Sequence, residues 1–155
     1  MITVLLATML STASAFGLTT SHQNQPAATS PFTGSWSADL SRSRLDAKLG
    51  ITGADITFGV TGNVITLASS VTLASGKPIT ERDTLRADGT ETPAVTPGAV
   101  HVANWVGSHV LALITRKENQ NLALITYEVS PDGQTLTART SGLVEQVIVF
   151  NRREQ

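Results

Sequence analysis

Short runs of β-branched and apolar residues recur along this chain, with residues that favour tight turns between them. The nine runs are residues 33–38, 55–60, 64–73, 79–86, 100–106, 109–116, 122–129, 135–140 and 144–151. Pairs such as Gly62-Asn63, Gly107-Ser108 and Asp132-Gly133 tolerate the positive φ angles of hairpins. Hairpin links between successive strands predict an antiparallel meander. We therefore predict an all-β fold, an up-and-down antiparallel β-barrel of about 8–10 strands.

The run at residues 78–86 differs from the others in its polarity. It places Ile79, Glu81, Asp83 and Leu85 on one side, and only Thr and Arg on the other. This pattern predicts a solvent-facing or edge strand, in which Glu81 and Asp83 are surface carboxylates rather than a catalytic pair. By contrast, residues 144–151 are apolar on both faces, which indicates a strand covered on both sides or placed in an oligomer interface.

Two stretches do not fit the strand pattern. Residues 41–50 are charged, with Leu45 and Leu49 four apart, and we predict a short helix there, before Gly50. Residues 91–99 carry two prolines, and we predict a loop over one end of the barrel.

Composition narrows the functional classes. The 155 residues suffice for one domain, and a hydrophobic content of 41% supports a core. The net charge is −1 and no basic patch interleaves with aromatics, so a nucleic-acid partner is not expected. The absence of cysteine excludes disulfides, thiolate metal sites and cysteine nucleophiles.

The first 15 residues have the pattern of a signal peptide. Ile2 to Leu10 is apolar but shorter than the ~20 residues that span a bilayer, and Ala13-Ser14-Ala15 supplies small residues for cleavage. No Lys or Arg precedes the apolar run, and a frayed apolar terminus is the alternative. We predict a signal peptide at 1–15, a flexible polar leader at 16–31 and a barrel domain at 32–155. The mature protein would be secreted or periplasmic, without an integral membrane segment.

The first strand opens with Gly34-x-Trp36, and a set of short motifs follows it in order. They are Ser41-Arg42-Ser43, Gly76-Lys77-Pro78, Arg86-Ala87-Asp88-Gly89, Trp105-x-Gly107 and the run from Ser130 to Thr137. This set resembles the lipocalins and related calycin barrels, and most closely a group of uncharacterised bacterial exported lipocalin-like domains. The resemblance implies a barrel closed at one end, with an apolar cavity. It also implies that an arginine of the last strand, Arg152 or Arg153, packs on Trp36, and stacking of guanidinium on indole would plug that end.

The residues predicted to line a ligand site are apolar or amphipathic. They are Trp105, Tyr127, Leu111, Leu113 and Ile125. The alternative is that these side chains are ordinary core.

His101 and His109 are the candidates for a metal site, with Glu128 or Glu145 adding a carboxylate. Their spacing places them on successive strands joined near Gly107-Ser108, where cross-strand neighbours can approach one metal. The interpretation that we adopt is two ordinary histidines, with the metal site as the alternative, so we expect no metal and no cofactor. No Gly-x-Ser-x-Gly elbow supports nucleophilic catalysis.

The function predicted from these features is binding of a small apolar or amphipathic ligand outside the cytoplasm. The alternatives are an interaction or structural module with a filled barrel, acting through its surface or as a homo-oligomer, and a small His-dependent enzyme.

Overall fold

A computed structural model describes residues 29–142 and 144–154, and these form one antiparallel sheet of ten strands. The strands are β1 (Gly34–Arg44), β2 (Ile51–Thr61), β3 (Val64–Leu73), β4 (Pro78–Arg86), β5 (Asp88–Pro93), β6 (Ala99–Trp105), β7 (Val110–Lys117), β8 (Gln120–Val129), β9 (Thr135–Gly142) and β10 (Gln146–Arg152). A single 3-10 turn, η1 (Ala47–Leu49), lies between β1 and β2. The predicted all-β barrel of 8–10 strands is confirmed.

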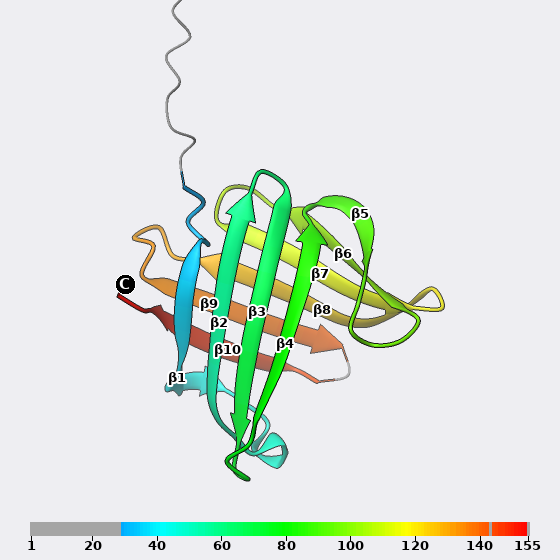
Figure 1. The fold of residues 1–155 in the computed structure, drawn as a ribbon. Coiled ribbons are helices and arrows are strands. Elements are labelled where there is room, and N and C mark those ends of the chain that lie inside the picture. The colour runs from blue at the N-terminus through cyan, green and yellow to red at the C-terminus, as the bar shows by residue number, and fades with distance from the viewer. Residues whose placement is uncertain (1–28, 143, 155) are drawn as a thin grey trace, which may run out of the picture.

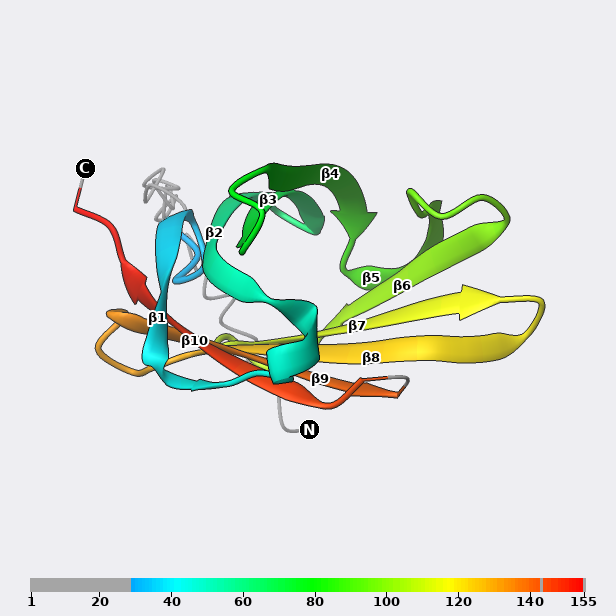
Figure 2. The ribbon, with the colours of Figure 1, turned by 90° about the horizontal axis from the view of Figure 1, so that it is seen from below.

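The sheet rolls into a barrel that is closed except at one place. The strand order is β4-β3-β2-β1-β10-β9-β8-β7-β6-β5, so β1 and β10 pair while β4 and β5 are the two edges. Strands β1–β4 form one layer, and β7–β10 cross behind it (Figure 1). Strands β4 and β5 follow each other in the chain, joined at Ala87, but they do not pair with each other. Figure 2 shows both strands from the end of the barrel. We call the unpaired line between them the β4–β5 seam.

Aromatic side chains fill the end of the barrel where β1 begins. Phe32 lies 5.6 Å from Phe58 and 5.2 Å from Trp105, and Phe58 lies 5.4 Å from Tyr127, measured between ring centroids. Phe32, Trp36 and Phe58 are fully buried. This end of the barrel, which we call the closed end, therefore has little room for a ligand.

Arg152, and not Arg153, covers Trp36. Its Cζ lies 4.1 Å from the Trp36 ring centroid, and the indole Nε1 donates to the carbonyl of Phe32 at 3.0 Å. The guanidinium also donates to three backbone carbonyls, those of Pro31 (2.6 Å), Thr33 (2.8 Å) and Gly133 (2.6 Å). Arg153 pairs instead with Asp55 in an exposed contact of 2.7 Å.

The helix predicted at residues 41–50 is wrong, apart from the short turn η1. Strand β1 continues to Arg44 through a bulge, because the Ser43 hydroxyl accepts a hydrogen bond from the Val149 amide at 3.0 Å. The Asp39 carboxylate accepts from the amide and hydroxyl of Ser41, which holds the extended backbone before the bulge. Such hydrogen bonds between side chains and the backbone compete with the backbone hydrogen bonds of a helix.

The loop predicted at residues 91–99 is also partly wrong, since β5 extends to Pro93. Thr92 of β5 pairs with His101 of β6. A proline is tolerated here because β5 is an edge strand, and on its unpaired side no backbone amide is needed to donate a hydrogen bond to a neighbouring strand.

Strand β4 is the edge strand that the sequence predicted, but its two carboxylates differ in burial. Leu85 and Asp83 pair with Ile65 and Leu67, which are buried, so this side of β4 faces the barrel interior. The Asp83 side chain is only 15% exposed. Glu81 is exposed, as the sequence predicted, whereas the interpretation of Asp83 as a surface residue is wrong, because its side chain is largely buried and faces inward. An alternating strand does not itself reveal which side is inward.

The folded unit includes residues just before Phe32. The Thr33 amide donates to the carbonyl of Ser30, and Pro31 accepts from Arg152. The predicted signal peptide and most of the leader lie outside the described residues. Within the described part of the chain, no helix has the length and apolarity to cross a membrane.

Candidate functional site

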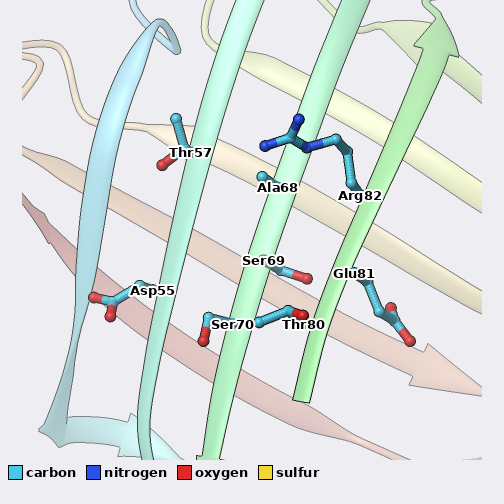
Figure 3. Close-up of a pocket in the computed structure, with 8 residues that line it drawn as sticks. All are labelled: Asp55, Thr57, Ala68, Ser69, Ser70, Thr80, Glu81 and Arg82. Carbon is cyan, nitrogen blue, oxygen red and sulfur yellow. The ribbon is translucent and has the colours of Figure 1, made fainter. Parts of the chain in front are cut away.

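Several hollows lie on the described residues, and three of them are considered as candidate binding sites. The outer hollow, of about 360 Å³, lies over β2, β3 and β4 and is lined by Asp55, Thr57, Ala68, Ser69, Ser70, Thr80, Glu81 and Arg82 (Figure 3). The Trp105 hollow, of about 350 Å³, is lined by Ser30, Pro31, Val60, Gly62, Trp105, Gly107 and Ser108. The seam pocket, of about 220 Å³, is smaller but more enclosed than either.

The outer hollow is an open depression on the outer side of the sheet, and most of its lining residues are of polar or charged types. Asp55 and Thr57 alternate with the buried Ala54, Ile56 and Phe58, so they face away from the interior. Arg82 reaches across β3 beside its register partner Ala68 (Figure 3). Small ligands prefer enclosed sites, and the outer hollow is more open to solvent than the seam pocket.

The seam pocket enters the barrel interior between edge strand β4 and strand β6, beside the loop that follows β5. Its lining residues are Leu67, Ser69, Glu81, Asp83, Ala94, Val95, Thr96, His101, Leu113, Thr115, Ile125 and Tyr127. The inner wall is apolar, because buried residues of β3, β7 and β8 meet there. The outer part is polar and is formed by side chains from both sides of the seam. The pocket thus has an apolar bottom and a polar mouth.

His101 connects the two sides of the seam. Its Nε2 lies 3.7 Å from Oδ1 of Asp83, and its Nδ1 lies 3.1 Å from the Thr115 hydroxyl, within hydrogen-bond distance. The contact with Asp83 is longer than a hydrogen bond, so it leaves the carboxylate free to accept one. None of the hydrogen bonds formed by the described residues ends on the Asp83 carboxylate. The polar groups here are only partly satisfied by the protein.

Tyr127 brings a second incompletely satisfied group to the seam pocket. The residue is 6% exposed, and none of the hydrogen bonds formed by the described residues involves its hydroxyl. Burial raises the pKa of Tyr127 well above its ordinary value, and the negative charges of Asp83 and Glu81 raise it further. The phenol therefore stays neutral and keeps its proton for donation.

The residues predicted to line a ligand site are divided between three places. Leu113, Ile125 and Tyr127 line the seam pocket. Leu111 is fully buried in the core, and Trp105 lines the Trp105 hollow at the other end of β6. Sequence reasoning did not assign Glu81, Asp83 and Ser69 to the pocket. The available signal was the position of both carboxylates between Ile79 and Leu85 on one face of β4.

The two histidines do not converge. The register partner of His101 is Thr115, whereas His109 lies outside β6 and β7 and contacts the Ser108 hydroxyl at 2.8 Å. The two candidate metal ligands are therefore not brought to one place. Glu128 pairs with Arg139, and Glu145 is exposed. No group of three or more His, Cys, Asp or Glu side chains among the described residues could hold a metal ion.

Comparison with known proteins gives a likeness of fold. No family model matches the chain, and no curated protein matches it either. Among solved structures, a Schistosoma mansoni fatty-acid-binding protein in complex with arachidonic acid aligns with a TM-score of 0.58 and 19% identity, over 81% of this chain and 98% of that one. The chain has the fold of the fatty-acid-binding barrels.

Two further structures support this assignment. Echinococcus granulosus fatty-acid-binding protein 1 aligns with a TM-score of 0.59 and 13% identity, over 80% of this chain and 98% of that one. The wild-type fluorescent protein UnaG aligns with a TM-score of 0.59 and 15% identity, over 79% and 97%. These barrels are related to the calycin type that Gly34-x-Trp36 led us to expect. At such identities the likeness concerns the fold alone.

Proposed function

We propose that this protein binds a small amphipathic molecule in the seam pocket. The observation that carries the proposal is the pocket itself, which combines an apolar inner wall with the polar side chains of Glu81, Asp83 and His101. A likeness to the Schistosoma mansoni barrel, whose structure contains arachidonic acid, supports the same class of function.

The volume of the pocket limits the size of the ligand. About 220 Å³ is below the ~300–1,000 Å³ of pockets for drug-sized molecules. The closed end is filled by Phe32, Trp36 and Phe58, so the apolar part of the ligand cannot extend there without displacing them. We therefore infer a short-chain or compact ligand that enters from the seam.

An adjacent pair of serines on β3 tests this proposal. Ser69 lines the seam pocket, and Ser70 lines the outer hollow but not the seam pocket. We expect the uncharged dye N-phenyl-1-naphthylamine to bind saturably, with one site per chain. Ser69→Leu is expected to weaken binding about tenfold, because added methyl groups occupy pocket volume. Ser70→Leu makes the same substitution outside the pocket and should leave the affinity unchanged.

Fluorescence titration measures both variants. Non-saturable binding, or an equal loss of affinity in the two variants, would contradict a ligand site in the seam pocket. A filled barrel that acts through its surface would then be the better account.

The location outside the cytoplasm is part of the proposal. Its support is the apolar stretch from Ile2 to Leu10 followed by Ala13-Ser14-Ala15. The mass of the mature protein tests it, since cleavage near Ala15 predicts a shorter chain, and an intact chain would contradict export by this route.

A further inference from the structure

The polar part of the seam pocket is acidic. Glu81 and Asp83 lie two residues apart on the same side of β4, and both line the pocket. Asp83 is largely buried, whereas Glu81 is exposed and also lines the outer hollow. No Lys or Arg is among its lining residues. The nearest arginine in sequence, Arg82, faces the outer hollow, and Arg116 pairs with Glu91. An anionic head group would find no cation on the pocket wall.

Asp83 lacks a strong partner inside the protein. Its side chain is 15% exposed, and its one ion-pair contact, with Nε2 of His101, is 3.7 Å long. None of the hydrogen bonds formed by the described residues ends on the Asp83 carboxylate. A largely buried carboxylate is costly unless hydrogen bonds or a counter-charge compensate it. The pocket therefore contains an acceptor that a donor from a ligand would satisfy.

Tyr127 supplies an independent indication of a ligand at the same place. It is more than nine-tenths buried, it lines the pocket, and its hydroxyl has no partner among the described residues. Two carboxylates and one hydroxyl thus line the same pocket, and none of the hydrogen bonds formed by the described residues ends on any of the three groups. A primary ammonium has three N–H donors and can match three such acceptors.

We propose that the seam pocket binds an alkylammonium, with the charged head between Asp83, Glu81 and Tyr127 and the alkyl chain against Leu113 and Ile125. The inference rests on the proposed function and names the ligand class. A carboxylate of the same chain length would be repelled by both acidic residues, and hydrogen bonds to charged groups are the stronger ones.

A matched set of eight-carbon compounds tests the charge of the head group. At neutral pH octylamine is a cation and octanoate an anion, and 1-octanol is neutral. We expect octylamine to bind at least about tenfold more tightly than octanoate and 1-octanol in isothermal titration calorimetry, with one site per chain.

Variants separate the pocket from the general charge of the protein. Asp83→Asn is expected to reduce octylamine affinity about tenfold or more while 1-octanol binding is kept. Glu81→Gln should also reduce octylamine affinity. It replaces Asp83→Asn as the test if that variant fails to fold without the His101 contact. Glu145→Gln removes the same charge from an exposed position outside the pocket and should change nothing.

Each other outcome counts against the inference. Tighter binding of octanoate, or equal binding of octylamine and 1-octanol, overturns the charge preference and leaves the proposed function standing. An equal effect of Glu145→Gln and Glu81→Gln overturns the placement of the ammonium. Binding of none of the three compounds overturns both the inference and the proposed function.

Discussion

Trp36→Ala is expected to lower the free energy of unfolding by about 3–5 kcal/mol. The Trp36 side chain is fully buried, donates to the carbonyl of Phe32 and carries Arg152 on its ring. Alanine would leave a cavity at the centre of the closed end and remove the surface on which the guanidinium stacks. Equilibrium unfolding in urea measures the change.

Val106→Ala is the control for this variant, since Val106 is 61% exposed and its truncation should cost less than about 0.5 kcal/mol. A loss below about 1 kcal/mol for Trp36→Ala would show that the closed end does not depend on the indole.

Arg152→Ala is expected to cost about 3 kcal/mol, while Arg153→Ala costs less than about 1 kcal/mol. Arg152 donates to three backbone carbonyls and stacks on Trp36. Its loss leaves the three carbonyls without these hydrogen-bond donors and exposes the Trp36 ring. Arg153 makes only an exposed ion pair with Asp55, which water and salt weaken. The two residues are neighbours of the same type, which makes them a matched pair.

Arg152→Lys separates charge from geometry. An ammonium cannot reach three carbonyls in the fixed fork of a guanidinium, nor stack on indole in the same way, so we expect only partial recovery. Thermal and urea unfolding of the variants measure the difference. Equal losses for Arg152→Ala and Arg153→Ala would contradict a special role of Arg152 in closing the barrel.

The closed end is the part of the molecule that sequence reasoning describes best. Gly34-x-Trp36 and the final arginines are short motifs whose partners can be inferred from resemblance, and alternation with turn residues marks most strands. Nothing local distinguishes Arg152 from Arg153. The choice depends on which one lies opposite Trp36 when β1 and β10 pair, and that register appears only in the fold.

The seam pocket could not be predicted because it depends on a contact between distant segments. Asp83 and His101 lie on β4 and β6, and they meet only because the sheet rolls up until its two edges approach. The charged pattern of β4 indicates an edge strand, which is correct, but an edge that closes a barrel can point charges inward. Leu113, Ile125 and Tyr127 were predicted as lining residues from their apolar or aromatic character. The polar residues Glu81 and Asp83 across the seam could not be assigned in this way, because charged residues on an edge strand usually face solvent.

Chemical-shift mapping by nuclear magnetic resonance tests the location of the ligand site most directly. Octylamine titrated into ¹⁵N-labelled protein should shift the amide signals of Asp83, His101 and Tyr127 most, because these residues line the seam pocket. The signals of Trp105 and Val60 in the Trp105 hollow, and of Asp55 and Ser70 in the outer hollow, should move little. If the largest shifts instead fall on either of those two hollows, the seam pocket is not the binding site.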